Sequence, residues 1–296
     1  MRNVPLDLRT RWRIGGQAPA LAEASSQEEL RGLLAELEGE TALVLGGGAN
    51  LLVSDQGPGA PVVVLGGEFK RQEVLEDTIR VGAAASIAGV VQAARRAARS
   101  GLWILEAVPG TMGGALRLNA GTADEWIWDR VLWAEVMLPD GSVERVVAED
   151  VQPSYRAIEL DPGAIFLRAE VAAPPADAAR VRQEHMQRRI EKLRAQVYDK
   201  PTCGSTWKNP GAPSPSAWEL VELVGMRGEK RGGAQVSPKH ANFIVNLGDA
   251  KAQDVIDLMI ETRRRVHEEK GIFLEPELHF WGFPGEVLRE LGAGTT

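Results

Sequence analysis

The sequence predicts an α+β fold, on the strength of its alternating local patterns, its length and one clear linker. Over the first two-thirds of the 296 residues, short strand-like apolar runs alternate with helical stretches. The length exceeds what one ordinary hydrophobic core accommodates. Behind the linker Ala173-Pro174-Pro175-Ala176, two long charged helical segments follow. We therefore predict a domain boundary near residue 174.

The helices are predicted from capping signals and apolar periodicity. Ser26 and Glu29 have the spacing of a capping box, and leucines follow at helical spacing. Ser86 opens a second predicted helix, which runs to about Arg99 and is stopped by Gly101. Behind the linker, helices are predicted over residues 177–196 and 252–269.

The strands are predicted from short apolar runs between turn residues. These runs lie at residues 41–45, 62–65, 79–83, 131–138, 143–147 and 165–171. The runs at 131–138 and 143–147 flank Asp140-Gly141, a dipeptide typical of a tight hairpin turn. We therefore expect these two strands to pair.

Composition and charge exclude several classes of function. Hydrophobic residues make up 44% and charged residues 25%, as in ordinary globular proteins, and the formal net charge is -7. The arginine-rich helix at 177–196 also carries Glu184 and Glu191, so we interpret it as a solvated face and expect no nucleic-acid partner. A single cysteine, Cys203, and four dispersed histidines predict no metal site.

The chain shows no signal for a membrane or for export. It contains no run of about 18 apolar residues. Its first residues have no apolar core before a small-residue cleavage site. We expect a cytoplasmic protein without membrane insertion.

A strand-like run ends in a first glycine-rich loop at residues 46–52. Successive backbone N–H groups in such a turn can form a concave nest for phosphate oxygens. Gly46 and Gly48 fit the start of the dinucleotide fingerprint, but Leu51 occupies the place of its third glycine, and the residues behind it do not begin a helix. Taken alone, this loop is equally compatible with a tight solvent-side turn.

A second glycine-rich loop, at residues 108–115, favours a phosphate-binding site over a simple turn. It also allows close backbone approach to a ligand, and Asn119-Ala120-Gly121 extends it. Two separated glycine loops, each near a strand end, suit a pyrophosphate bridged by both. The candidate cofactor-binding residues are Gly46, Gly47, Gly48, Ala49, Asn50, Leu51, Pro109, Gly110, Thr111, Gly113, Gly114, Ala115, Asn119 and Gly121.

With these loops the chain resembles the UDP-N-acetylenolpyruvoylglucosamine reductases, a family of flavoproteins of the vanillyl-alcohol-oxidase/cresol-methylhydroxylase type. The segments 45–52 and 109–115 are similar to the two FAD pyrophosphate loops of that family, and residues 13–16 resemble its opening motif. Ala49 stands where a serine is common, so one hydroxyl contact to phosphate would be lost. The resemblance implies FAD as cofactor, with NADPH as hydride donor. Because residues 1–184 contain no histidine to which the flavin could be attached, we expect the FAD to be non-covalent.

Three further motifs carry the resemblance over essentially the whole chain. Ser154-Tyr155-Arg156, the segment 204–210 and Glu275-Pro276-Glu277 are similar to the family's Tyr-Arg, serine and C-terminal glutamate motifs. The resemblance implies reduction of UDP-N-acetylglucosamine enolpyruvate to UDP-N-acetylmuramate for peptidoglycan synthesis, by hydride addition to C3 and proton addition to C2.

The resemblance also assigns roles to individual residues. Arg156 would stabilise the charge that develops on the substrate carboxylate, because a guanidinium stays charged and binds in two places. Ser205 would give the proton to C2, and Glu277, rather than Glu275, would assist. Substrate-binding residues would be Tyr155, Arg156, Lys208, Asn209 and His240, although a packing or capping role for His240 is equally possible.

The family's architecture implies three parts. An FAD-binding domain of two subdomains, split near residue 66, would occupy residues 1–173, and a smaller α+β substrate domain would occupy residues 174–270. Residues 271–296 would return to the flavin with Glu277. The short connection at 171–201 lacks an inserted tyrosine-bearing loop, so the chain resembles the insertion-free branch, and we expect a monomer.

Two alternatives stay open from the residues alone. One is an oxidase of the same flavin superfamily, many of which attach flavin through a histidine near the first loop; residues 1–184 contain no histidine. The other is a non-redox UDP-sugar binder or transferase, in which both loops would hold the sugar nucleotide. The visible spectrum of the purified protein would separate the second from a flavoenzyme.

Overall fold

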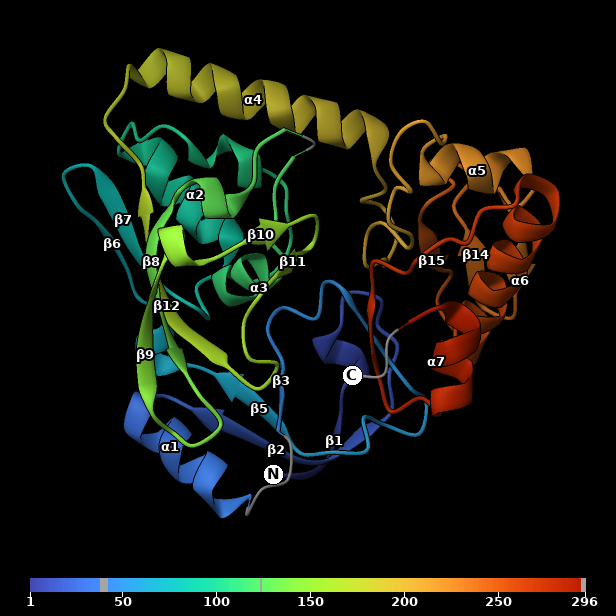
Figure 1. Cartoon of the computed structure of the whole chain (residues 1–296), viewed down its shortest axis with the longest axis horizontal. Coiled ribbons are helices and arrows are strands. Elements are labelled where there is room, and N and C mark those ends of the chain that lie inside the picture. The colour runs from blue at the N-terminus through green and yellow to red at the C-terminus, as the bar shows by residue number, and fades with distance from the viewer. Residues whose placement is uncertain (38–41, 123, 294–296) are drawn as a thin grey trace. The chain divides into compact units, whose positions relative to one another are not determined.

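The computed structural model describes residues 1–37, 42–122 and 124–293, which form two compact units (Figure 1). The loop unit consists of Leu21–Gly47 and Val62–Lys192. The terminal unit consists of Met1–Ala20, Gly48–Pro61 and Leu193–Thr296. Both contain helices and strands, so the α+β prediction is confirmed.

In the loop unit, a small parallel sheet positions the first glycine loop. Strand β2 (Gln17–Ala24) enters this unit at Leu21 and pairs in parallel with β5 (Val62–Leu65), which pairs in parallel with β3 (Leu43–Val44). Helix α1 (Gln27–Glu36) follows β2, and the Ser26 hydroxyl accepts the Glu29 N–H at 3.2 Å, as the capping box predicts. Thr41, the first residue of the predicted strand 41–45, lies outside the described residues.

A five-stranded antiparallel sheet forms the larger part of the loop unit. Its order is β6-β7-β12-β8-β9, and helices pack on it over a core that includes Val90, Leu105 and Phe166. The strands are β6 (Gln72–Val74), β7 (Thr78–Gly82), β8 (Val131–Met137), β9 (Val143–Val147) and β12 (Ile165–Ala172). The helices are α2 (Ile87–Arg96), α3 (Met112–Arg117), η2 (Gly67–Lys70), η3 (Leu102–Leu105), η4 (Ile127–Asp129) and η5 (Ala148–Asp150).

The terminal unit joins both ends of the chain around one core. Strand β4 (Leu51–Val53) pairs in parallel with β16 (His279–Trp281), and β1 (Arg2–Pro5) pairs antiparallel with the first half of β2. The remaining elements are η1 (Asp7–Arg9), α5 (Ala217–Leu223), β13 (Lys230–Arg231), β14 (Ala234–Val236), β15 (Ile244–Asn246), α6 (Ala252–Lys270) and α7 (Gly285–Leu291). Strands β13, β14 and β15 form an antiparallel sheet.

The two units divide the chain differently from the predicted boundaries near residues 66 and 174. Trp12, Ile14 and Leu52, all early in the sequence, are buried in the same core as α5, α6 and α7. The indole N–H of Trp12 donates to the carbonyl of Ile244 at 2.8 Å. Early segments therefore complete the terminal unit, because their apolar side chains share one core with residues from 203 onward.

Helix α4 (Ala178–Ala195) also crosses the division, since its residues up to Lys192 belong to the loop unit. Its predicted range, 177–196, is confirmed within one residue at each end. In the terminal unit the Lys239 ammonium donates to the carbonyls of Leu193 at 2.8 Å and Gln196 at 2.6 Å. A cation at this place complements the partial negative charge of a helix C-terminus.

The predicted hairpin is confirmed, while one predicted helix stop is wrong. Strands β8 and β9 pair from Met137↔Val143 to Trp133↔Val147. Helix α2 ends at Arg96, and Ala98 takes the left-handed conformation with φ 52°. Gly101 instead has φ 92° and precedes the 3-10 helix η3. The glycine serves the next turn of the chain, which the periodicity of α2 could not reveal.

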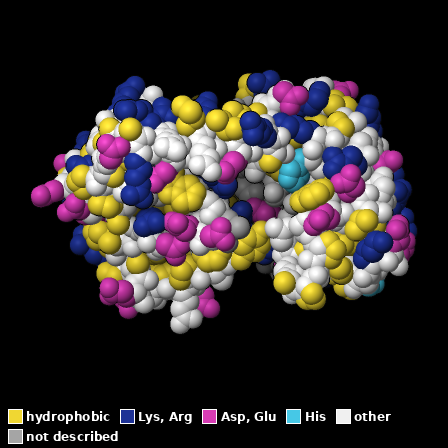
Figure 2. All heavy atoms as spheres, turned by 90° about the horizontal axis from the view of Figure 1, so that it is seen from above, with side chains coloured by type: hydrophobic (Ala, Val, Ile, Leu, Met, Phe, Trp, Pro, Cys, Tyr) yellow, Lys and Arg dark blue, Asp and Glu magenta, His cyan; other side chains and the backbone are white. Residues whose placement is uncertain are grey.

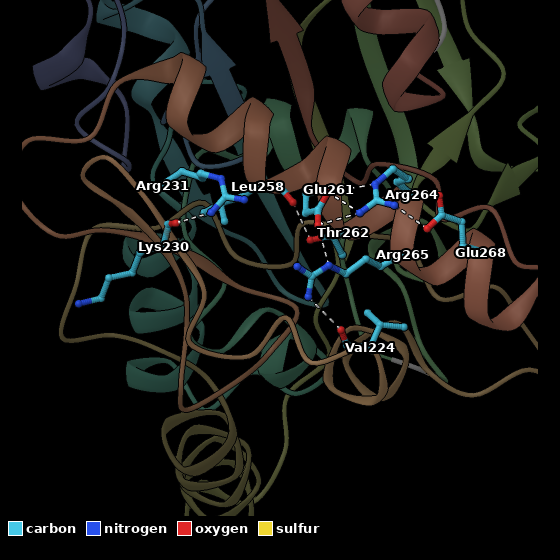
Figure 3. A network of polar contacts seen from close by, with 9 residues as sticks. All are labelled: Val224, Lys230, Arg231, Leu258, Glu261, Thr262, Arg264, Arg265 and Glu268. Atoms are coloured by element: carbon cyan, nitrogen blue, oxygen red, sulfur yellow. Dashed lines mark hydrogen bonds and ion pairs between the residues drawn. The ribbon is translucent and has the colours of Figure 1, made fainter.

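Charged side chains on α6 form a network on the surface of the terminal unit (Figure 3). Glu261 accepts from Arg264 at 2.9 Å and from Arg265 at 2.6 Å, and Arg264 also reaches Glu268 at 2.5 Å. More widely, Lys and Arg side chains are interspersed with Asp and Glu across the face seen in Figure 2.

Two properties of the described residues bear on membranes and metals. Within the ranges that the structure describes, no helix combines the length and the apolar character needed to cross a bilayer. The same residues contain no group of three or more His, Cys, Asp or Glu side chains placed to hold a metal ion.

Candidate active site

The two glycine loops touch each other within the loop unit. A Cβ atom on Gly47 would lie 2.6 Å from the Cα of Gly110, and one on Gly46 would lie 2.7 Å from the Thr111 hydroxyl oxygen. Both distances are below ordinary van der Waals contact, so only glycine allows this approach without a shift of the second loop. Gly46 and Gly47 are themselves solvent-exposed.

The second loop presents open backbone beside this contact. Gly110 has φ 111°, and Thr111 precedes helix α3 with an extended backbone. Gly113 packs against Ala83, where a Cβ would lie 3.0 Å from the alanine methyl carbon, whereas Gly114 is exposed. The exposed glycines of both loops make a strip without side chains, which fits a phosphate-bearing group such as the pyrophosphate of FAD.

The first loop continues into the terminal unit at Gly48. This glycine has φ 54°, and a Cβ on it would lie 2.3 Å from the carbonyl oxygen of Arg9. Ala49 and Asn50 are half-buried, and the Asn50 amide donates to the carbonyl of Glu277 at 2.8 Å. Leu51 begins β4, so the prediction that no helix opens here is confirmed.

Asn119 and Gly121, which extend the second loop, are tied to protein groups. Asn119 is fully buried with φ 42°, and its side-chain amide donates to the carbonyl of Ser154 at 3.0 Å. A Cβ on Gly121 would lie 2.2 Å from the carbonyl oxygen of Glu125. The glycine at 121 is therefore explained by the approach of the chain segment that leads to Trp126.

Arg156 lies at the tip of a two-residue hairpin that Asn119 anchors. Strands β10 (Pro153–Ser154) and β11 (Ala157–Ile158) pair antiparallel, which leaves Tyr155 and Arg156 as the connection. Arg156 has φ 61°, an uncommon conformation for a residue with a side chain. Its guanidinium carbon lies 5.1 Å from the centre of the Tyr155 ring. The loop unit thus joins Arg156 to the second glycine loop through one buried amide.

In the terminal unit, Ser205 lies on an extended segment between two others. Ser205 forms a bridge with Phe243, and Trp207 forms one with Pro276. The N–H of Thr206 donates to the carbonyl of Asn242 at 2.8 Å, and the N–H of Glu277 donates to the carbonyl of Thr206 at 2.9 Å. Of the three predicted catalytic residues, Glu277 is therefore hydrogen-bonded through its backbone to Thr206, the residue that follows Ser205. Arg156 belongs to the loop unit.

The other predicted substrate residues surround this segment in the terminal unit. The Lys208 ammonium lies 3.7 Å from a carboxylate oxygen of Glu275. The Asn209 side-chain oxygen accepts the N–H of Ala217 at 2.9 Å, at the start of α5. His240 is half-buried and packs on Phe243, with ring centres 4.7 Å apart.

The contacts of His240 indicate its charge state. Its Nδ1 accepts the N–H of Asn242 at 3.3 Å, which requires an unprotonated Nδ1. Burial, together with the nearby guanidinium of Arg227, lowers the pKa of His240 below its ordinary value. A neutral imidazole follows from both observations.

Cys203 is a buried structural neighbour of this segment. Its thiol lies 3.6 Å from the carbonyl oxygen of Gly48 and 3.5 Å from that of Leu51. Burial raises the pKa of the Cys203 thiol to about 11. A thiol that remains protonated at neutral pH is a poor nucleophile.

A buried polar cluster beneath α4 was not predicted from the sequence. In the loop unit, His185 Nδ1 donates to Glu106 at 2.8 Å, and Arg189 lies 3.7 Å from the other oxygen of that carboxylate. The hydrogen bond from His185 holds the pKa of Glu106 below its ordinary value despite burial. Burial and the nearby Arg188 and Arg156 lower the pKa of Lys192 to about 8.

Two models of known protein families match separate parts of the chain. A model of the UDP-N-acetylenolpyruvoylglucosamine reductase C-terminal domain matches residues 196–281. A model of an FAD binding domain matches residues 18–147. The second range contains both glycine loops, and the first contains Ser205 and Glu277.

Individual relatives are similar over nearly the whole chain. UDP-N-acetylenolpyruvoylglucosamine reductase 2 of Symbiobacterium thermophilum is 41% identical over 286 residues, which cover 95% of this chain and 92% of the relative. The reductase of Acidiphilium cryptum is 39% identical, with 95% and 91% covered. The crystal structure of UDP-N-acetylenolpyruvylglucosamine reductase from Thermus caldophilus is 34% identical with a TM-score of 0.83, covering 94% of this chain and 97% of that one.

Proposed function

Because the chain belongs to the UDP-N-acetylenolpyruvoylglucosamine reductase family, we propose that it reduces UDP-N-acetylglucosamine enolpyruvate to UDP-N-acetylmuramate with NADPH. The observation that carries the proposal is the direct contact of the two glycine loops, Gly47 on Gly110, which builds one open backbone surface from two distant segments. The product is a precursor of peptidoglycan.

The loop unit is the part that would hold FAD. Its exposed glycines at residues 46, 47 and 114 leave backbone groups accessible to a pyrophosphate. Bound FAD would supply the redox chemistry, taking a hydride from NADPH and delivering it from N5 to C3 of the enolpyruvyl group. The binding is non-covalent in this proposal, since no histidine occurs in residues 1–184.

Arg156 would bind and stabilise the substrate carboxylate. Hydride addition at C3 moves negative charge toward that carboxylate, and a guanidinium can stabilise it with two parallel hydrogen bonds. The positive φ of 61° at this half-buried arginine supports this role, because strained backbone conformations cluster at functional sites.

Ser205 would donate the proton to C2. The new C–H bond forms as the Oγ–H bond breaks, and solvent then returns a proton to the Ser205 oxygen. A hydroxyl is a weak acid, so this transfer depends on a fixed position and a charged neighbourhood. Lys208, three residues after Ser205, could supply that charge; its side chain is 34% exposed and lies beside Glu275.

Glu277 would assist the transfer from the neighbouring segment, either by orienting groups or by an acidic proton. Its backbone N–H is bonded to the residue after Ser205, which ties the two positions together. Tyr155, Lys208, Asn209 and His240 would contact the substrate. As a neutral imidazole, His240 would offer a hydrogen bond rather than a charge.

The proposal also covers the domains, the location and the assembly of the protein. We retain an FAD-binding domain of two subdomains, a substrate domain and a C-terminal segment that returns to the flavin with Glu277. The pairing of β16 with β4, the strand that follows the first glycine loop in the sequence, supports that return. A cytoplasmic location remains our expectation, because both NADPH and the sugar nucleotide are phosphorylated metabolites. We also keep the expectation of a monomer from the sequence.

The variant Ser205→Ala tests the assigned proton donor. Flavin reduction by NADPH should continue at the parent rate, whereas reoxidation of the reduced flavin by the enolpyruvyl sugar nucleotide should slow by about 10²–10⁴-fold, the usual contribution of a positioned acid. Stopped-flow absorbance under anaerobic conditions measures the two half-reactions separately.

Ser214→Ala is the matched control, because it removes a hydroxyl from the same unit at a position without an assigned role. It should leave both half-reactions unchanged. If Ser205→Ala is reoxidised as fast as this control, Ser205 is not the proton donor.

A further inference from the structure

Asn242 is buried, and its backbone and side-chain polar groups all form hydrogen bonds to the segment that begins at Ser205 or to His240. Only 5% of it is exposed. Its side-chain oxygen accepts the N–H of Trp207 at 2.9 Å, and its side-chain nitrogen donates to the carbonyl of Trp207 at 2.9 Å. Its own carbonyl accepts from Thr206 at 2.8 Å, and its N–H donates to His240.

The Asn242 side chain pairs with the backbone of Trp207 in the way that a neighbouring β-strand would. A primary amide carries a donor and an acceptor side by side, so it can pair with both backbone groups of one residue. The isolated bridge between Ser205 and Phe243 ends the regular pairing on this edge, and the Asn242 amide continues it to Trp207. On the opposite edge, Glu277 N–H bonds to Thr206 and Lys208 N–H bonds to Glu275.

The segment that begins at Ser205 is therefore hydrogen-bonded along both edges, and Asn242 supplies the hydrogen bonds along one of the two edges. Aspartate at this place would offer two acceptors and would face the carbonyl of Trp207 without a donor. An apolar residue would leave both backbone groups of Trp207 buried and unpaired, because Trp207 is 2% exposed. Among side chains of this length, only asparagine satisfies both groups.

We propose that Asn242 is a positioning residue for the proton transfer, which fixes the Ser205 hydroxyl by clamping the backbone of Trp207. The inference rests on the proposed role of Ser205 as proton donor. Proton transfer needs a donor held within hydrogen-bond reach of its target, so a loosened segment slows this step and spares steps that do not use Ser205.

Two variants at Asn242 test this, with a control at a residue of the same kind. Asn242→Asp keeps the shape and removes the donor, and Asn242→Ala removes both bonds without adding a charge. Asn246 is the control, because it is 4% exposed and its amide donates to the carbonyl of Trp12 at 2.9 Å in the same unit. Asn246→Asp and Asn246→Ala therefore remove comparable buried bonds away from Ser205.

The measurement is anaerobic stopped-flow absorbance of the FAD-bound enzyme, first with NADPH and then with the enolpyruvyl sugar nucleotide. We expect both Asn242 variants to slow reoxidation by about tenfold or more and to raise its solvent deuterium isotope effect. Flavin reduction should stay within about twofold of the parent rate. The Asn246 variants that fold should leave both half-reactions near the parent rate.

The double variant Ser205→Ala/Asn242→Ala separates the possible failures. If Asn242 acts through Ser205, it should react no more slowly than Ser205→Ala alone. A parent-like rate in Asn242→Ala, equal slowing in the Asn246 variants, or full additional slowing in the double variant would each overturn the inference. Fast reoxidation of Ser205→Ala itself would instead overturn the proposed role of Ser205 as proton donor, on which the inference rests.

Discussion

Helices α4 and α6 are similar in length and rich in charged residues, yet they bury different kinds of side chain. Helix α6 buries an almost wholly apolar face, made of Ala252, Val255, Ile256, Leu258, Met259, Thr262 and Val266. Helix α4 buries Val181 together with His185 and Lys192. The charges of α6 stay in the network of Figure 3, where each carboxylate keeps some solvent contact.

The difference indicates what each helix contributes. Partly exposed ion pairs such as those of α6 contribute up to about 1 kcal/mol each, and the apolar face stabilises the unit. Burial of a lysine costs free energy, because the charged form loses its hydration. The buried charge of Lys192 is therefore a poor source of stability, and it lies close enough to Arg156 for the two cations to interact.

The largest effect is expected from the buried pair of α4. Glu106→Gln removes the charge that His185 and Arg189 contact, and we expect the free energy of unfolding to fall by about 2–3 kcal/mol, as for buried charge-assisted bonds. Urea unfolding of the FAD-bound protein at neutral pH measures it.

Glu261→Gln on α6 is the comparison for that variant. It also removes a carboxylate paired with two arginines, but one that is more exposed, so its cost should stay below about 1 kcal/mol and shrink at high salt. Equal losses in the two variants would contradict the distinction between the helices.

A smaller effect of opposite sign is expected at Lys192. Lys192→Met removes a buried charge and keeps most of the side-chain volume, so the unfolding free energy should rise by about 1–2 kcal/mol at neutral pH. Urea unfolding again measures it. A loss of stability would show that the charge of Lys192 is compensated in the folded state.

The pH dependence of the unfolding free energy of Lys192→Met is a second test of whether the buried charge of Lys192 destabilises the folded state. The pKa of Lys192 is about 8 in the folded protein and about 10.4 in an unfolded chain. Below pH 8 Lys192 is protonated in both the folded and the unfolded state, so folding bears the full free-energy cost of burying the charged ammonium. As pH rises from 8 toward 10.4, the folded state loses its proton first, and this cost decreases. The stability difference between Lys192→Met and the parent should therefore shrink over that interval.

Local patterns predicted the elements and several close approaches of this fold. The Asp140-Gly141 turn predicted the β8–β9 hairpin, and apolar spacing predicted α6, because both signals lie within a few residues. The two glycine loops were predicted to face one ligand, and the structure brings Gly47 and Gly110 into contact.

The parts that could not be predicted depend on partners distant in sequence. Nothing near Trp12 shows that it packs beside Ile244, and nothing near His185 shows that its partner is Glu106, 79 residues earlier. Asn242 likewise looks like an ordinary polar residue until Trp207 is placed beside it. Motifs marked Ser205 and Glu277, whereas the residues that hold them in place became visible only in three dimensions.

The most direct test of the central claim is a two-step anaerobic titration of the purified, flavin-loaded enzyme followed by visible absorbance. NADPH should bleach the flavin band, and subsequent addition of UDP-N-acetylglucosamine enolpyruvate should restore it with formation of one equivalent of UDP-N-acetylmuramate. A correctly folded protein without flavin, or a reduced flavin that the sugar nucleotide leaves bleached, would contradict the account.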